Sequence, residues 1–180
     1  IARGLASVEA GGDGRLGRLS ADLGAVVLSE AATAARFATK RAQLHLRPGD
    51  GPTALWEVAY KAEQNRIEAD PTSPLGAALS ALGPEVALAM FEATLNGRPQ
   101  SRLSPRSGTI AAIVARWRDD GGNVELRRVK LAWGGLDIEA AGTLSLDSRL
   151  RPIGALTARV RGHEKLIEAL VAMGEMSAAE

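Results

Sequence analysis

The chain has 180 residues, of which 46% are hydrophobic, which is enough to bury the core of one compact domain. Lys and Arg total 22 and Asp and Glu total 21, so the net charge is +1 and no basic surface for nucleic acid or anionic membranes is expected. The absence of Cys and the presence of only 2 His exclude disulfides, thiolate metal sites and thiol nucleophiles, and leave few residues for acid–base chemistry.

Alternation of apolar and polar residues, broken by turn dipeptides, predicts strands along the first half of the chain. Asp13-Gly14 and Asp50-Gly51 are turn pairs whose residues tolerate positive φ, so the flanking strands are expected to form antiparallel hairpins. A short Ala-rich stretch over 31–37 predicts one turn of helix between them. The predicted strands of this half are 5–10, 16–28, 42–47 and 55–62.

Two helices are predicted in the middle of the chain, each opened by a Ser-Pro pair. Ser73-Pro74 supplies an N-cap and a first-turn proline to a helix that ends at Gly83-Pro84. Ser104-Pro105 opens the second helix, which ends at Gly121-Gly122. Its apolar stripe consists of Ile110, Ile113, Val114 and Trp117. The segment 86–95 lies between the two helices and alternates as a strand.

The last third of the chain predicts three strands and a helix. Strand 136–147 has aliphatic residues on one face and Asp137 and Glu139 on the other. In the strand before it the apolar phase slips at Arg127-Arg128, which predicts a β-bulge, and Gly134-Gly135 joins the two strands. A strand over 155–161 is followed by a helix whose apolar residues span 166–173 and which stops at Gly174, and 177–180 form a frayed tail.

These elements predict a single α+β domain over residues 1–176, as the C-terminal part of a longer chain. The sheet is expected to be a curved, half-barrel-like antiparallel meander of about eight to ten strands, with about three helices packed on one face.

Motifs that carry enzymatic chemistry find little support. Gly12 to Gly17 match G-x-G-x-x-G, but the residues that follow alternate as a strand, whereas a dinucleotide site needs a helix there. We interpret the motif as a hairpin turn. His45 lies between two core-facing leucines and His163 opens the last helix, and neither has a carboxylate at ligand spacing. Surface or capping roles are therefore favoured for both.

Asp137 and Glu139 are the strongest pair of candidate catalytic carboxylates, because they project from the same strand face about 7 Å apart. Arg159 and Arg161 alternate on the strand that is expected to pair beside them. Cross-strand ion pairs on a solvated face explain this pattern without an active site.

The apolar composition is aliphatic, with 33 Ala and 23 Leu against 3 Trp, 2 Phe and 1 Tyr. Trp117 and Trp133 are predicted core anchors. The strand 86–95 is apolar on both faces, so a helix, a partner or a bound apolar molecule is expected to cover each face. Since helices are available, a packed core is the competing interpretation. The predicted lining of an apolar groove is Trp56, Val58, Tyr60, Val86, Leu88, Met90 and Phe91.

An ordered string of motifs in the second half resembles one bacterial family. The motifs are Ala-Arg-Trp-Arg-Asp-Asp-Gly-Gly at 115–122, Leu-Ala-Trp-Gly-Gly-Leu at 131–136, Gly-Thr-Leu-Ser-Leu-Asp at 142–147 and Leu-Arg-Pro at 150–152, and residues 36–48 are similar as well. The family is catalogued as domain of unknown function number 2125. The resemblance implies a longer parent with an N-terminal membrane segment, facing the periplasm, and it carries over no catalytic residue. At the level of fold, the meander is similar to the half-barrels of lipid-carrying envelope proteins.

The sequence thus predicts a non-catalytic, periplasmic envelope domain, anchored to the inner membrane in the full-length protein. No cofactor, metal or nucleic-acid partner is expected, and a lipid or other apolar small molecule in the concave face of the sheet is the expected ligand. The alternative is an assembly module that binds another envelope protein or a second copy of itself. A hydrolase using Asp137, Glu139 or His45 ranks third.

Overall fold

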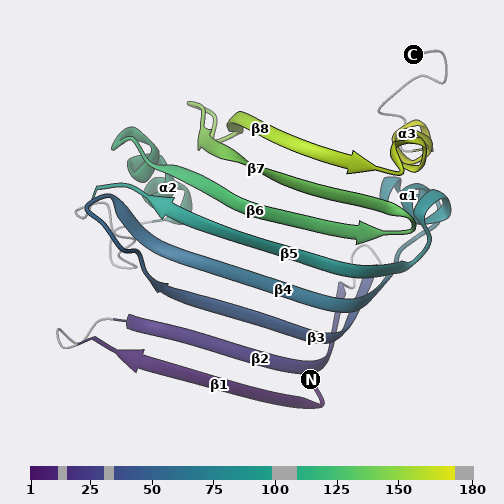
Figure 1. Cartoon of the computed structure of the whole chain (residues 1–180), viewed down its shortest axis with the longest axis horizontal. Coiled ribbons are helices and arrows are strands. Elements are labelled where there is room, and N and C mark those ends of the chain that lie inside the picture. Colours follow the sequence, from purple (N-terminus) through teal and green to yellow (C-terminus); the bar gives the residue numbers. More distant parts are fainter. Residues whose placement is uncertain (12–15, 31–34, 99–108, 173–180) are drawn as a thin grey trace.

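The computed structural model describes residues 1–11, 16–30, 35–98 and 109–172 as one antiparallel sheet with three short helices (Figure 1). The strands are β1 (Arg3–Ala10), β2 (Leu16–Glu30), β3 (Ala35–Pro48), β4 (Ala54–Glu68), β5 (Glu85–Asn96), β6 (Asn123–Trp133), β7 (Leu136–Leu146) and β8 (Pro152–Arg161), and the helices are α1 (Pro74–Leu82), α2 (Ile110–Asp119) and α3 (His163–Ala172). Each strand pairs with its neighbours in sequence, in the order β1 to β8. The predicted α+β meander is confirmed.

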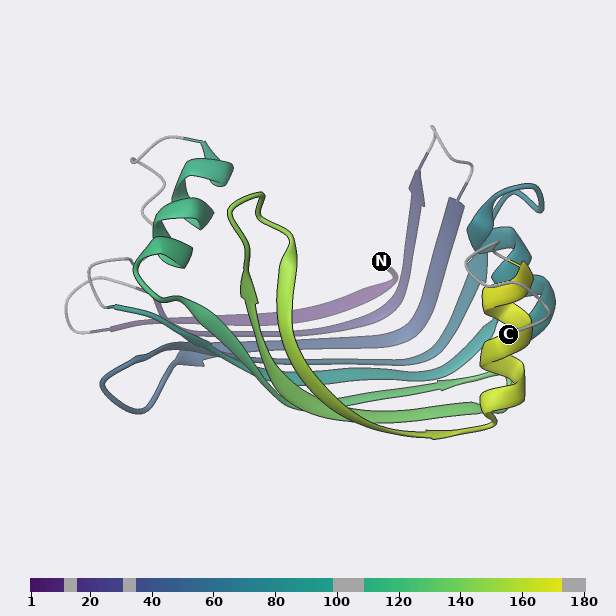
Figure 2. The same cartoon turned by 90° about the horizontal axis from the view of Figure 1, so that it is seen from above.

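The sheet is bent into a trough. Figure 2 shows the ends of the strands rising on one side of the sheet, with α2 at one end and α1 and α3 at the other. The trough therefore runs across the strands, from β1 to β8, and the helices flank it. At about 4.8 Å between neighbouring strands, its floor is roughly 35 Å long.

The bend follows a row of irregular positions in neighbouring strands. The residues Ala25, Lys40, Gln64 and Ala87 are all left out of the regular pairing between their strands. Ala25 and Gln64 adopt φ values of 50° and 52°, which are unusual outside glycine. Each strand gains one residue here, so the alternation of apolar residues along its sequence shifts by one position at the bend. The apolar residues therefore stay on the same face of the sheet on both sides of the bend.

Two buried polar side chains stabilise the backbone at this bend. Thr39 Oγ1 donates to the carbonyls of Arg41 and Glu63 at 3.0 and 3.1 Å. Asn65 Nδ2 donates to the carbonyls of Ala62 and Val86 at 3.2 and 3.0 Å. Asn65 is only 1% exposed, and its Oδ1 is buried without a hydrogen-bond partner among the described residues. The Asn65 side chain therefore stabilises the backbone of the bend as a hydrogen-bond donor.

Replacing Asn65 by Ala is expected to destabilise the fold by about 1–3 kcal/mol, because two buried carbonyls lose their donor. Urea unfolding followed by circular dichroism measures the change. The exposed neighbour Gln64, changed to Ala, is the control and should shift the midpoint much less. Equal stability of Asn65→Ala and the wild type would show that the bend does not depend on these hydrogen bonds.

Along one side of the trough, at the strand ends, α1 is held by its caps and by a tryptophan. The Ser73 side chain accepts from the N–H of Gly76, and Gly83 caps the C-terminus, as predicted. Trp133 Nε1 donates to the carbonyl of Gly83 at 2.7 Å. Leu82 and Leu136 form a buried cluster there, with Ala81, Trp133, Ile138 and Val160 packed around it. The predicted anchoring role of Trp133 is confirmed.

Along the other side of the trough, α2 begins at Ile110, with Thr109 as its N-cap. Trp117 is 6% exposed and donates from Nε1 to the carbonyl of Asn96 at 2.8 Å, so its predicted role as an anchor is confirmed. A Cβ on Gly122 would lie 2.3 Å from Trp117 Cε2, so only glycine allows the backbone to approach this ring.

Other predictions have definite outcomes. The bulge at Arg127-Arg128 and the Gly134-Gly135 turn are confirmed. The helical turn over 31–37 is wrong where it can be checked, since β3 already begins at Ala35. The predictions for Asp13-Gly14, residues 31–34, Ser104-Pro105, Gly174 and the tail 177–180 lie outside the described residues. Among the described helices, none has the length and apolar character to cross a membrane.

Candidate functional site

The two faces of the sheet differ sharply in polarity. Residues paired directly across neighbouring strands share a face, so the register assigns each side chain to one side. The side that carries α1 and α2 is the concave face of the trough (Figure 2). Its central positions are Ala42, Leu44, Leu46, Val58, Tyr60, Ala62, Ala89, Phe91, Ala93, Val129, Leu131, Ile138 and Ala140. The opposite, convex face carries the charged residues.

Five of the seven predicted lining residues lie on the concave face. Trp56, Val58 and Tyr60 project there from β4, and Val86 and Phe91 from β5. The prediction was wrong for the other two, Leu88 and Met90, which pair with Glu63 and Lys61 on the convex face. The irregularity at Ala87 explains the error, because it moves Val86 out of phase with the even-numbered residues that follow it.

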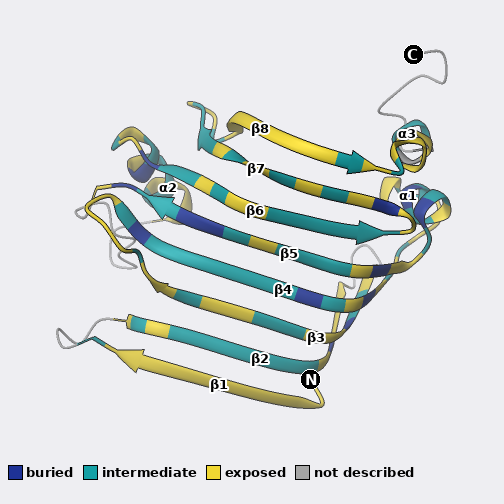
Figure 3. Ribbon diagram, viewed as in Figure 1, coloured by how far each residue is buried: buried dark blue, intermediate teal, exposed yellow. Residues whose placement is uncertain are grey.

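The concave face is open to solvent along much of its length. Trp56, Val58 and Tyr60 are half-buried, and Phe91 is 36% exposed. The Tyr60 and Phe91 rings lie side by side with centroids 5.6 Å apart. Figure 3 shows that the buried positions are few and that β1 and β8 are largely exposed. The chain exposes 11563 Å², whereas a compact monomer of this mass would expose about 8,300 Å².

The concave face is also almost free of charge. Apart from Glu30 at the end of β2, every strand residue that the described register places there is uncharged. Its buried polar side chains, Thr39 and Asn65, direct their donors at backbone carbonyls. The described strand residues therefore offer hydrocarbon contact across all eight strands and, apart from Glu30, no charged group to a polar ligand.

Sequence reasoning missed much of this lining. Leu44 on β3, Val129 on β6 and Ile138 on β7 share the concave face with the predicted residues. The available signal was the phase flip within the long strands: the apolar positions pass from Leu23 to Val26 in β2, and from Phe37 to Ala42 in β3. Reading those flips as bulges would have joined the apolar positions of β2 to β5 into one face.

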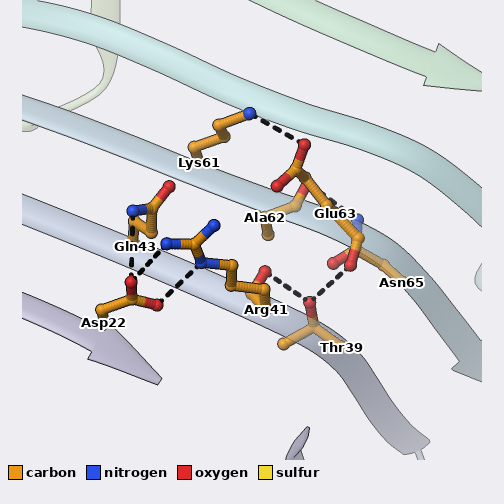
Figure 4. A network of polar contacts seen from close by, with 8 residues as sticks. All are labelled: Asp22, Thr39, Arg41, Gln43, Lys61, Ala62, Glu63 and Asn65. Atoms are coloured by element: carbon orange, nitrogen blue, oxygen red, sulfur yellow. Dashed lines mark hydrogen bonds and ion pairs between the residues drawn. The ribbon is translucent and has the colours of Figure 1, made fainter. Parts of the chain in front are cut away.

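A hollow of about 740 Å³ lies on the convex side of the bend and is bordered by charged residues. Figure 4 shows that three of them, Asp22, Arg41 and Glu63, are engaged in hydrogen bonds or ion pairs. Arg41 donates to both carboxylate oxygens of Asp22, at 2.9 and 2.5 Å, and Lys61 Nζ lies 2.8 Å from Glu63. The hydrogen bond from Arg41 holds the pKa of Asp22 below its ordinary value. A shallow surface with its charges paired in this way explains the hollow without a ligand.

The predicted catalytic candidates also lie on the convex face. Glu139 and Asp137 pair in register with Arg159 and Arg161, as expected. The nearest cation to Glu139 is Lys130 Nζ at 2.5 Å, and its hydrogen bond lowers the pKa of Glu139, with the two arginines adding to the effect. Glu139 is therefore an ion-paired carboxylate, poorly suited to act as a general acid.

The two histidines lie far apart in the fold. His45 Nδ1 lies 3.0 Å from Ser20 Oγ on the convex face, and His163 Nε2 lies 3.5 Å from its neighbour Glu164 at the start of α3. Within the described ranges, no three His, Asp or Glu side chains converge as metal ligands would. The structure thus brings the apolar candidates together and leaves the polar ones dispersed.

The turn between β7 and β8 makes stability depend on pH. Asp147 accepts hydrogen bonds from the Arg151 side chain and from the backbone N–H groups of Arg151 and Arg149, which hold its pKa below the ordinary 3.8. Because the pKa of Asp147 is lower in the folded protein than the ordinary 3.8, its ionised carboxylate stabilises the fold at pH values above 3.8. This stabilisation is lost as the pH falls through the pKa of the folded state. Asp147→Asn should therefore melt below the wild type at neutral pH, with the gap closing in acid. Thermal melts across this range measure the gap, and a gap independent of pH would contradict the assignment.

A family model, described as uncharacterized protein conserved in bacteria (DUF2125), matches residues 2–180 of the chain. No curated protein and no solved structure matches the chain.

Proposed function

The chain belongs to the DUF2125 family of uncharacterized bacterial proteins, and from its open trough we propose that it binds the hydrocarbon part of a lipid on the concave face. The observation that carries the proposal is an exposed apolar surface, continuous over eight strands, on which Glu30 is the single charged strand residue of the described register. An apolar face of this extent is unusual on a soluble monomer and marks a binding surface.

The helices support a ligand more than a packed core. α1 and α3 pack together at one end of the strands, and α2 stands at the other (Figure 2). The central aromatic residues Tyr60 and Phe91 are left partly exposed between them. Covering such residues is worth roughly 25 cal/mol per Å² of apolar surface, so an apolar chain laid along the floor gains affinity without any polar contact.

We place this activity in the bacterial envelope, on the periplasmic side, with the domain anchored to the inner membrane through its parent chain. A lipid-binding trough is useful where lipids move between or along membranes, and the family resemblance implies the same location. Fusing the full-length protein to a reporter that is active only in the periplasm tests it. An inactive fusion, together with activity of a matched fusion to a reporter that works only in the cytoplasm, would contradict it.

We further propose that the domain has no catalytic role, since its carboxylate candidates are ion-paired or dispersed on the convex face. The test is incubation of the purified protein with phospholipid and ester substrates. Turnover that survives substitution of Phe91 on the trough floor but is lost in Glu139→Gln would overturn this part of the proposal.

Lipid binding is tested by purifying the protein from bacteria without detergent and recording native mass spectra before and after organic extraction. The expected result is a set of adducts with lipid masses that extraction removes and that mixed phospholipid vesicles restore. A protein that is free of lipid after purification and stays free after incubation with vesicles would overturn the proposal.

The alternative is that another envelope protein or a second copy covers the trough. The fully exposed edge strand β1 and the largely exposed edge strand β8 favour this candidate, since unpaired edges invite pairing with another chain. Sedimentation velocity separates the two: a lipid-loaded monomer supports lipid binding, whereas a lipid-free dimer that buries the concave face supports assembly.

A further inference from the structure

An apolar pocket that is partly open to solvent lies under α2, along one side of the trough. Its volume is about 300 Å³, and its walls include Leu95, Val114, Trp117, Val124, Leu144 and Leu146. Helix α2 supplies Val114 and Trp117 as a roof, while the ends of β5, β6 and β7 supply the floor. Helix α2 thus covers part of this pocket, whereas the centre of the trough has no helix above it.

We propose that this pocket, which we call the α2 pocket, receives the methyl end of the lipid's hydrocarbon chain and sets the preferred chain length. The inference rests on the proposed lipid binding and adds a specific subsite to it. A cavity of half this volume, lined by aliphatic residues, holds a benzene ring, so the α2 pocket can take on the order of ten carbon atoms.

The chemistry of the walls points to a chain end and not to a headgroup. The polar atoms near the pocket are already used: Trp117 Nε1 donates to the carbonyl of Asn96, and Ser145 Oγ donates to the carbonyl of Gly122. Among the described residues, none that lines the pocket is charged. A ligand group with hydrogen-bonding needs would lose its water here without gaining a partner, whereas methylene groups lose nothing.

The pocket is continuous with the concave face. Leu95 is followed along β5 by Ala93 and Phe91 on the same side of the sheet, and Leu144 is followed along β7 by Gly142 and Ala140. These rows lead from the pocket to the centre of the trough, and Ala93 and Gly142 leave little side chain to block the way. A chain whose end lies under α2 can therefore run on over the floor.

The roof is built to hold its position. Besides the Trp117 hydrogen bond, Arg118 Nη1 donates to the carbonyl of Asp147 at 3.0 Å, which ties the C-terminal end of α2 to the turn after β7. These two hydrogen bonds hold the C-terminal end of α2 over the strand ends. A chain-length preference requires that this part of the roof keeps its place.

Filling the pocket tests the proposal. The probes are octanoate, laurate, palmitate and stearate, titrated by calorimetry into wild type, Val114→Phe and the control Ile110→Phe. Ile110 lies one turn earlier on the same helix and is 81% exposed, so its substitution leaves the pocket unchanged. We expect Val114→Phe to weaken stearate and palmitate by about tenfold while octanoate is unaffected, since about two methylene groups lose their burial.

The proposed role of the α2 pocket would be overturned if Val114→Phe left the chain-length profile unchanged, or if Ile110→Phe weakened stearate and palmitate equally. Either result would leave the proposed lipid binding intact. If the wild type binds none of the probes, the proposed function itself fails. Leu144→Phe fills the pocket from the floor and provides a second variant should Val114→Phe melt early. The same shift toward shorter chains in both variants supports the assignment.

Discussion

Replacing Phe91 by Asp is expected to weaken lipid binding by about a hundredfold or more, because a carboxylate in the middle of the trough must give up water against hydrocarbon. Phe91 lies on the concave face beside Tyr60 and is 36% exposed, so the aspartate reaches solvent in the empty trough and the fold tolerates it. The loss is therefore expected in binding and not in stability.

The matched control for this variant is Met90→Asp on the same strand. Met90 pairs with Lys61 and Lys130 on the convex face, so an aspartate there gains two cationic neighbours and leaves the trough unchanged. Dissociation constants for palmitate, measured by titration, compare the two variants. Similar losses in both, or none in Phe91→Asp, would show that the ligand does not lie on the concave face.

Removal of Trp117 has the largest expected effect on stability. The ring is 6% exposed, donates to Asn96 and fills the space above Gly122 and Gly97, so Trp117→Ala should cost about 3–5 kcal/mol. For a chain of this length that corresponds to a melting temperature lower by roughly 10 °C. Calorimetry or a circular dichroism melt measures it.

Two further variants make this prediction specific. Gly122→Ala places a methyl group against the Trp117 ring and should also destabilise the fold, whereas Trp56→Ala removes a half-buried ring from the open floor and should cost much less. A larger loss of stability from Trp56→Ala than from Trp117→Ala would contradict the assignment of the buried core to the strand ends.

The fold was largely predictable because its signals are local. The alternation over β7, the Gly134-Gly135 turn and the cap at Ser73 each act within a few residues, and the meander follows when neighbouring strands pair in order. The bulge at Arg127-Arg128 was visible for the same reason, since the apolar phase changes over two polar residues.

The site was less predictable because it depends on how long strands continue through a bend. Leu88 and Met90 look like groove residues in an uninterrupted strand, but the irregularity at Ala87 sends them to the convex face. Whether the apolar face is covered depends on where the helices pack, and that is set by contacts between distant segments, such as Trp133 with Gly83 and Trp117 with Asn96. Periodicity alone carries no information on those contacts.

Thiol protection gives the most direct test of where a lipid binds. The chain has no Cys, so Val58→Cys and Ala59→Cys each introduce one thiol, at adjacent half-buried positions of β4 that face opposite sides of the sheet. We predict that saturating palmitate slows alkylation by N-ethylmaleimide in Val58→Cys and leaves the rate in Ala59→Cys unchanged. Equal rates with and without palmitate in Val58→Cys, or protection confined to Ala59→Cys, would contradict lipid binding on the concave face.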